Sequence, residues 1–209
     1  VPHVEVELIV VNGSSVSFSH QIKDNDRVAV YPVFESFDVS PVIKLREQPL
    51  RNTKFILDVH LGKLAKYLRM LGFDTLYQND FDDPEIVDIA KRENRIILTR
   101  DIGILKIKSV THGYWLRSQH PSKHLEEVVK RFHLSNSINL FERCMDCNGK
   151  IAEVDKDKIL ENLKPKTKKY YKQFYQCDNC EKIYWEGSHF VQMKKFAHRF
   201  INENETKTC

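Results

Sequence analysis

Three aspartates stand where an apolar run has just ended or where a helix is about to begin. Asp58 follows Phe55 to Leu57, Asp101 follows Ile96 to Thr99 after one intervening arginine, and Asp83 precedes a proline and a glutamate. Carboxylates gathered at one place hold hard ions such as Mg²⁺ or Mn²⁺. One or two such ions stabilise the charge on the attacking and leaving oxygens when a phosphodiester is hydrolysed. These aspartates therefore suggest phosphodiester hydrolysis.

Other roles for the same acids remain open from spacing alone. Asp83 is also well placed to cap a helix whose first residue is Pro84. Asp80 and Asp82 could be ligands, groups that support the ligands, or solvated loop acids. A metal-binding cluster and a set of ordinary loop and capping acids both fit the spacing.

Two CxxC pairs give the sequence its most specific signal. Cys144 and Cys147 form the first pair, and Cys177 and Cys180 form the second. Four thiolates close a tetrahedral shell, so we expect one structural zinc ion. The insert between the pairs is longer than the usual ~15–20 residues, and disulfides or free thiols are the alternatives. Metal-binding cysteines favour a reducing compartment, so we predict a cytoplasmic protein in which Cys209 is not a ligand.

Basic residues fit a polyanionic substrate. The run from Lys164 to Lys172 is interleaved with tyrosines, a mixture able to contact phosphates and to stack on unpaired bases. The alternative is a solvated hairpin with its aromatic side chains packed on the cysteine-containing segment. Lys66 and Arg69 lie on the same predicted helix near Asp58. The candidate RNA-binding residues are Lys63, Arg100, Lys166, Lys168, Lys169, Tyr171 and Lys172.

Hydrophobic periodicity predicts an α/β scaffold that positions these side chains. Phe55 to Leu57 and Ile96 to Thr99 are continuous apolar runs, typical of strands buried on both faces of a parallel sheet. Between them, His60 to Leu71 has an apolar helical stripe, and a second helix begins near Asp83 and ends at Asn94. Right-handed crossovers bring the carboxyl ends of the strands to one edge, where the aspartates should meet. Further helices are expected over Ser122 to Phe132, Asp155 to Leu163 and Phe190 to Ile201.

The first fifty residues form a separate β-rich segment. Val4 to Val11 turns at Asn12-Gly13 into Ser15 to Phe18, and Arg27 to Val33 makes a third strand. The stretch NGSSV…KDNDRVAVYPVFES resembles the carboxyl half of a ubiquitin-like β-grasp of the sulfur-carrier branch, without its opening hairpin and helix or a terminal Gly-Gly. We expect a module that packs or docks a protein partner, followed by a linker to about Thr53.

The rest of the chain resembles a known nuclease family. FILDVHLGKLAKYLRMLGFDTLYQND, DDPEIVDIAKRENRIILTRD and CMDC…CDNC-EKIYWEGSHF are similar to the Mut-seven C-terminal RNase domain family, over about Thr53 to Ile201. The resemblance implies a PIN-like parallel sheet with flanking helices, a zinc ribbon and an RNase that depends on Mg²⁺ or Mn²⁺. The family's motif acids fall on Asp58, Asp83 and Asp101.

A fourth acid is common in PIN-like nucleases, and none occurs in Ile102 to Lys108. This absence weighs against a complete two-metal site. Asp82 is the remaining candidate catalytic residue. Two other classes of function stay open. The chain could be a non-catalytic nucleic-acid-binding module whose acids hold metal weakly or not at all, or a scaffold for protein interactions. For the ribonuclease and for the non-catalytic binding module, the predicted partner is RNA, expected to be single-stranded.

Composition limits the remaining possibilities. A hydrophobic fraction of 41% over 209 residues is enough for packed cores, and no apolar run approaches the length of a membrane span. The net charge of +4 says little by itself. We predict four parts: a partial ubiquitin-like segment (1–50), the nuclease core (53–140), the zinc ribbon with its insert (141–188), and a helix with a tail (189–209).

Overall fold

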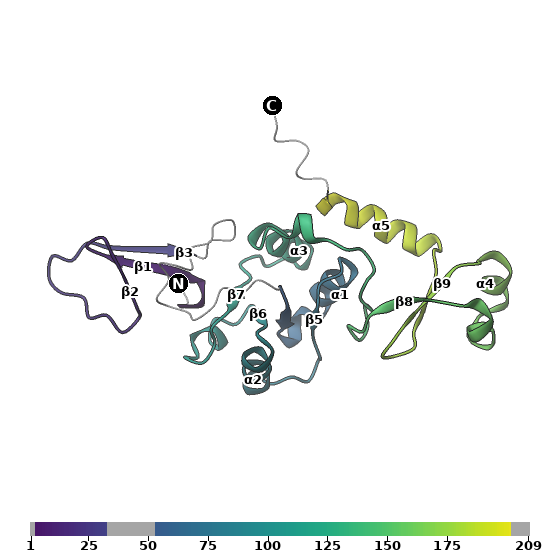
Figure 1. The fold of residues 1–209 in the computed structure, drawn as a ribbon, viewed down its shortest axis with the longest axis horizontal. Coiled ribbons are helices and arrows are strands. Elements are labelled where there is room, and N and C mark those ends of the chain that lie inside the picture. Colours follow the sequence, from purple (N-terminus) through teal and green to yellow (C-terminus); the bar gives the residue numbers. More distant parts are fainter. Residues whose placement is uncertain (1–2, 33–52, 202–209) are drawn as a thin grey trace, which may run out of the picture. The chain divides into compact units, whose positions relative to one another are not determined.

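The computed structural model describes residues 3–32 and 53–201, drawn as a ribbon in Figure 1. The predicted linker up to Thr53 and the tail after Ile201 lie outside the described residues, apart from Thr53 itself. The chain divides into two compact units. The first unit comprises Val1–Gly62 and Tyr77–Arg117, and the second comprises Lys63–Leu76 and Ser118–Cys209. Both units are therefore built from two separate stretches of sequence.

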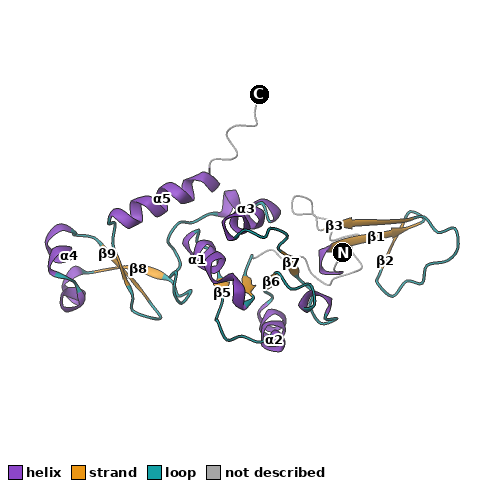
Figure 2. Cartoon of the chain, turned by 180° about the vertical axis from the view of Figure 1, so that it is seen from behind, coloured by secondary structure: helices purple, strands orange, loops and turns teal. Residues whose placement is uncertain are grey.

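The N-terminal part of the first unit is an antiparallel sheet. After a 3-10 turn, η1 (His3–Glu5), the strands β1 (Val6–Val11), β2 (Ser14–Val16) and β3 (Val28–Pro32) pair in the order β2-β1-β3. Asn12 and Gly13 have φ angles of 51° and 84°, as a tight hairpin turn requires. The predicted hairpin is confirmed, and the strands are visible in Figure 2.

A parallel sheet forms the rest of the first unit. The strands β4 (Phe55–Leu57), β6 (Ile96–Thr99) and β7 (Gly113–Trp115) lie in the order β4-β6-β7, with Leu57 opposite Leu98 and Leu98 opposite Tyr114. Every residue of β4 and β6 is buried, as their continuous apolar sequences predict. The short turns η2 (Val59–Leu61) and η3 (Ile104–Lys106) follow the ends of β4 and β6.

Helix α2 (Asp83–Glu93) contacts β4 and β6 through the apolar face that the sequence predicts. Asn94 ends this helix in the left-handed conformation at φ 51°, also as predicted. The start of the helix differs from the prediction, because Asp82, and not Asp83, is the capping residue. The Asp82 carboxylate accepts a hydrogen bond from the backbone N–H of Glu85 at 2.8 Å. Asp83 is consequently the first residue of the helix.

The second unit is mainly helical, with a small antiparallel sheet in the order β10-β9-β8. We call Arg143 to Tyr184 the ribbon, because it contains this sheet and both CxxC pairs. The predicted helix over residues 155–163 is a 3-10 helix, and the basic run forms a short α-helix. The elements are α1 (Gly62–Met70), β5 (Thr75–Leu76), α3 (Pro121–Arg131), η4 (Leu134–Ser137), β8 (Ile151–Val154), η5 (Lys156–Asn162), α4 (Pro165–Tyr170), β9 (Phe174–Cys177), β10 (Ile183–Tyr184) and α5 (Ser188–Ile201).

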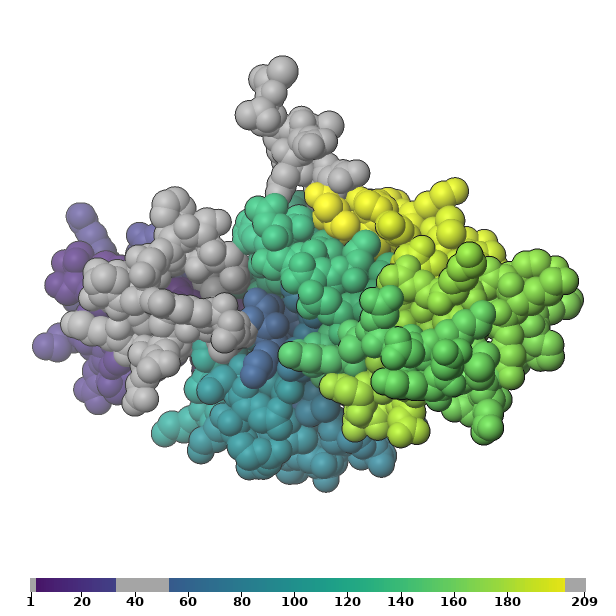
Figure 3. Space-filling view, turned by 45° about the vertical axis from the view of Figure 1, so that its right-hand side comes forward, coloured from purple at the N-terminus to yellow at the C-terminus, as the bar shows by residue number. Residues whose placement is uncertain are grey.

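Aromatic pairs hold α5 within the second unit. Phe190 packs on Phe141 with ring centroids 4.5 Å apart, and Phe196 packs on Tyr67 of α1 at 5.0 Å. In the space-filling view of Figure 3 the atoms of α5 (yellow) lie against those of the ribbon (green). The fold is thus α/β with a parallel sheet, as the sequence predicts. Within the described residues, no helix combines the length and apolarity needed to cross a membrane.

Candidate active site and thiolate cluster

Asp58 is the first residue after β4, at the carboxyl end of the parallel sheet. Its carboxylate is buried and accepts a hydrogen bond from the hydroxyl of Thr99 on the neighbouring strand β6 at 2.9 Å. The Thr99 hydroxyl in turn accepts a hydrogen bond from the backbone N–H of Asp101 at 2.8 Å. One hydroxyl therefore joins the two acids that follow the neighbouring strands β4 and β6.

Asp101 lies just beyond the end of β6 and is exposed to solvent. Its Oδ1 atom accepts a hydrogen bond from the backbone N–H of Gly103 at 2.7 Å, which fixes the carboxylate beside the turn. Trp115 of β7 supports the same corner, because its indole N–H donates to the carbonyl oxygen of Arg100 at 3.2 Å. The acid therefore projects from a stiff turn next to the sheet edge.

Asp83 lies close enough to the other acids to sense their charges. Partial burial, and then the negative charges of Asp101, Asp58 and Asp82, raise the pKa of the Asp83 carboxyl above its ordinary value. The Asp82 carboxylate is occupied by the helix cap, whereas Asp83 is not needed for capping. The geometry thus separates two neighbouring acids that sequence spacing leaves ambiguous.

Thr99 is the residue of this site that the sequence analysis overlooked. A fully buried threonine inside an apolar strand is the available signal, because a buried hydroxyl must find hydrogen-bond partners. Here both partners are the predicted acids or their backbone.

Four thiols converge in the second unit. Among the described residues, Cys144, Cys147, Cys177 and Cys180 are the one group of three or more metal-binding side chains close enough to hold an ion, with all ligand atoms within 4.8 Å of one another. Cys144 and Cys180 have sulfurs 3.6 Å apart, and Cys147 and Cys177 have sulfurs 3.4 Å apart. Sulfurs around a tetrahedral zinc ion are about 3.8 Å apart, given Zn–S bonds of about 2.3 Å. The cluster is therefore compatible with a structural zinc ion.

The thiols cannot all ionise on their own. Burial acts to raise the pKa of Cys147, but hydrogen bonds from the Gly149 N–H and from neighbouring groups outweigh it and lower this pKa to about 6. Burial and the adjacent sulfurs raise the pKa of Cys180 to about 12. Ionisation of Cys147 is thus favoured, while that of Cys180 is disfavoured. Four thiolates need a bound cation, which is the role that zinc would have here.

Arg69 supports the first cysteine knuckle and does not face a substrate. Arg69 was expected to fit a polyanionic substrate together with the other basic residues of its helix, and that expectation is wrong, because only 3% of Arg69 is exposed. Its guanidinium donates to the carbonyl oxygens of Thr75, Met145 and Asp146 at 2.8, 3.2 and 2.7 Å. Burial lowers the pKa of Arg69, while the charges of nearby groups act in the opposite direction.

A second set of contacts fixes the other side of the knuckle. Asp74 accepts hydrogen bonds from Asn148 at 2.8 Å and from Arg143 at 3.5 Å. Asn148 also accepts from the backbone N–H of Thr75 at 2.9 Å. The loop that carries Cys144 and Cys147 is therefore attached to Lys63–Leu76 on both sides, by contacts that no sequence motif reveals.

The predicted RNA-binding residues fall in both units. Arg100 lies in the first unit beside Asp101, and the other six lie in the second. Lys63 is exposed on α1, above the ring of Tyr67 at 5.8 Å. Lys166 and Lys169 are exposed on α4, with Lys168 half-buried, and Lys172 is exposed just after the helix. Tyr171 is half-buried against Ile159, Leu163 and Phe174, so this ring does pack on the ribbon.

The parallel sheet, with acids beyond the carboxyl ends of its strands, defines an α/β protein whose ligand site is expected at that edge. Comparison with family models identifies the group. Residues 53–197 match the Mut7-C RNAse domain, so the chain belongs to that family and has a nuclease-like function. Residues 1–38 match the Mut7-C ubiquitin model, which confirms the ubiquitin-like N-terminal segment. Searches of curated proteins and of solved structures found no match.

Proposed function

We propose that this protein is a divalent-metal-dependent ribonuclease that hydrolyses RNA phosphodiester bonds. Asp58, Asp83 and Asp101 are the proposed catalytic acids, and the zinc-binding ribbon aids RNA binding. The observation that carries the proposal is the Thr99 hydroxyl, which donates to the Asp58 carboxylate and accepts from the backbone N–H of Asp101 at the carboxyl ends of neighbouring strands. Burial and then the charges of these acids raise the pKa of the Asp83 carboxyl, which supports its place in the same site. Family membership supplies the reaction class, and the acids supply a place for it.

The type of donor fits Mg²⁺ or Mn²⁺, since hard ions prefer carboxylate oxygens. When bound, such an ion stabilises the developing charge on the attacking and leaving oxygens of the phosphodiester. Thr99 orients the Asp58 carboxylate by donating to Oδ2, and the Gly103 N–H orients that of Asp101. Burial and the neighbouring acids raise the pKa of the Asp83 carboxyl, and a cation nearby would favour its charged form.

The test is cleavage of single-stranded RNA with and without added Mg²⁺ or Mn²⁺, by the unchanged protein and by the Asp101→Asn variant. A non-catalytic RNA-binding module would bind the strand but leave it intact under every condition. The ubiquitin-like segment supports an additional interaction with a protein partner. A cytoplasmic location remains a prediction from cysteine usage.

The neighbouring acids Asp82 and Asp83 are expected to give opposite phenotypes. Asp82→Ala removes the helix cap and should lower the free energy of unfolding by about 1 kcal/mol while RNA cleavage persists. Asp83→Asn should leave stability nearly unchanged and lower the cleavage rate, because it removes a ligand charge. Chemical denaturation and cleavage rates measured on both variants separate the roles. Loss of cleavage in Asp82→Ala without loss of stability would transfer the catalytic role to Asp82.

The lysines of α4 and its end are expected to supply affinity without taking part in the chemistry. Changing Lys166, Lys168, Lys169 and Lys172 to Ala should weaken RNA binding and flatten its dependence on salt, because fewer phosphates are neutralised. Alanine maintains the helix, so the fold is expected to persist. Binding titrations at several salt concentrations provide the measurement, with Lys123→Ala and Lys130→Ala on α3 as controls. An unchanged salt slope would mean that α4 is simply a solvated face.

A further inference from the structure

The second unit contains a large hollow that the acids and the thiolate cluster do not explain. Its volume is about 1010 Å³, and it is formed by the ribbon, α1 and the first turns of α5. Binding pockets commonly measure ~300–1,000 Å³, so this one is at the upper end of that range. Its lining includes Lys66, Tyr171, Tyr184, Trp185, His189 and Lys194.

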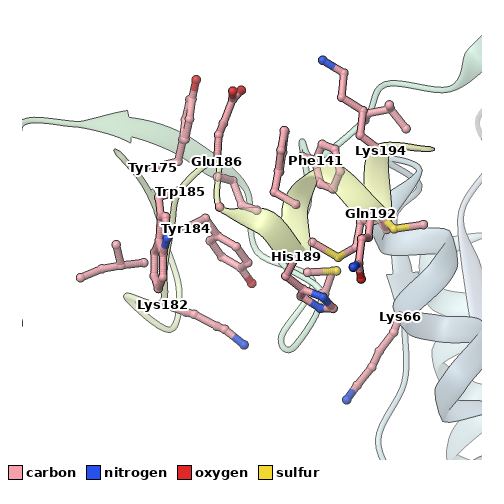
Figure 4. A pocket seen from close by; sticks show the side chains of 18 of the residues that line it. Lys66, Phe141, Tyr175, Lys182, Tyr184, Trp185, Glu186, His189, Gln192 and Lys194 are labelled. Atoms are coloured by element: carbon pink, nitrogen blue, oxygen red, sulfur yellow. The ribbon is translucent and has the colours of Figure 1, made fainter. Parts of the chain in front are cut away.

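Aromatic side chains dominate its wall. Trp185 follows β10 directly and is 37% exposed, so part of its ring is accessible from the hollow. Tyr171 lies beside it, with ring centroids 6.3 Å apart and planes tilted by 51°. Figure 4 shows Tyr184 and Trp185 along one part of the hollow and His189 and Lys66 along another. Unpaired bases stack on such rings regardless of their identity.

Charged side chains of both signs line the hollow beside the aromatic wall. Lys66 and Lys194 both line the hollow, and within the described part of the chain neither forms an ion pair. Lys182 also lines it, above the ring of Tyr184 at 5.7 Å, with its ammonium paired to Asp146. Glu142 and Glu186 are the remaining acids there.

Helix α4 ends at Tyr170, directly before Tyr171 of the hollow, so its lysines lie close to the hollow along the chain. An apolar peptide would leave the ammonium groups of Lys66 and Lys194 without a partner. A nucleic-acid strand would use both the aromatic rings, for stacking, and these lysines, for phosphate contacts.

We propose that this hollow binds unpaired nucleotides of the RNA substrate, with bases stacked on Trp185 and phosphates near Lys66 and Lys194. The inference deepens the proposed function by assigning a site for single-stranded substrate in the second unit, apart from the acids. Duplex RNA does not offer free base faces and should bind there poorly. The hollow would thus select single strands without reading their sequence.

Binding is tested without chemistry, using fluorescently labelled oligouridylate and a labelled RNA duplex with no divalent ion added. Trp185→Ala should weaken oligouridylate binding about tenfold, as expected for the loss of one stacked base, and change duplex binding little. Trp185→Phe should restore most of the affinity. Phe18→Ala is the matched control, since Phe18 is an exposed aromatic side chain of the first unit, far along the chain from the hollow.

Intrinsic fluorescence gives an independent readout, because the chain has two tryptophans. Oligouridylate should quench the emission of a Trp115→Phe variant, in which Trp185 remains, more strongly than that of Trp185→Phe, in which Trp115 beside Arg100 remains. Unchanged affinity in Trp185→Ala combined with Lys66→Ala would overturn the inference even if the protein cleaves RNA. A dimer in sedimentation that Trp185→Ala dissociates would also overturn it, because a second copy would then occupy the hollow. If Trp185→Ala weakens oligouridylate binding as expected but the unchanged protein does not cleave RNA, only the proposed function is contradicted.

Discussion

Asp101→Asn is expected to lower the rate of RNA cleavage by roughly a hundredfold or more while RNA binding persists. The substitution keeps the shape of the side chain and its acceptor for the Gly103 N–H, but it removes one negative charge from the proposed ion site. Electrostatic stabilisation of the reacting oxygens contributes several kcal/mol in metal-dependent hydrolysis, and each 1.36 kcal/mol is about a tenfold change in rate. Asp58→Asn should have a similar effect, since Asn can still accept the hydrogen bond from Thr99.

Cleavage is to be followed under single-turnover conditions at several Mn²⁺ concentrations, beside binding titrations of the same strand. The matched control is Asp88→Asn, which changes an exposed aspartate of α2 that pairs with Arg92 at 2.9 Å. This surface pair contributes a few tenths of a kcal/mol, so the control should cleave normally. Normal cleavage by both Asp58→Asn and Asp101→Asn would show that the reaction takes place elsewhere.

Replacing a cysteine of the cluster is expected to unfold the ribbon. Protein purified without chelator should contain about one zinc ion per chain, and Cys177→Ser should contain almost none. Zinc binding contributes an apparent ~10–16 kcal/mol in small zinc domains, which exceeds what the short strands β8, β9 and β10 could replace. Loss of the ion should therefore expose Phe174 and the rest of its apolar cluster.

Elemental analysis measures the zinc content, and hydrogen exchange over Arg143 to Tyr184 measures the order of the ribbon. Cys209→Ser is the control, because this cysteine lies outside both CxxC pairs and should not affect the metal. Because Arg69 and Asp74 attach the knuckle to Lys63–Leu76, loss of zinc should also raise hydrogen exchange in α1. A fully folded ribbon in zinc-free Cys177→Ser would contradict a structural role for the ion.

Much of the fold could be predicted because local patterns and burial agree. The strands β4 and β6 are apolar throughout and fully buried, and the apolar stripe of α1 packs inward as its spacing predicts. The spacing of the two CxxC pairs likewise predicted that the four cysteines lie together, as they do. In these places the property that can be read from the sequence is the same property that stabilises the structure.

The remaining features depend on contacts between residues far apart in the chain. From the sequence, a charged side chain such as Arg69 is predicted to lie at the surface. Its burial follows only from its acceptors, which are carbonyl oxygens of another segment. Similarly, Asp82 and Asp83 both satisfy the sequence preferences for a helix cap, and a shift of one residue decides which of them remains available for chemistry. The hollow beside Trp185 has no motif, because it results from how separate elements pack.

The contacts of Arg69 also bear on how the chain folds while it is being made. Its guanidinium donates to the carbonyl oxygen of Asp146, which lies 77 residues later in the sequence. A ribosome adding ~5–20 residues per second needs about 4–15 s to produce that partner. During this interval the arginine side of α1 has no native acceptor, and the second unit cannot close until the cysteine knuckles have emerged. Completion of this unit is therefore tied to the synthesis of the segment from Cys144 to Cys180.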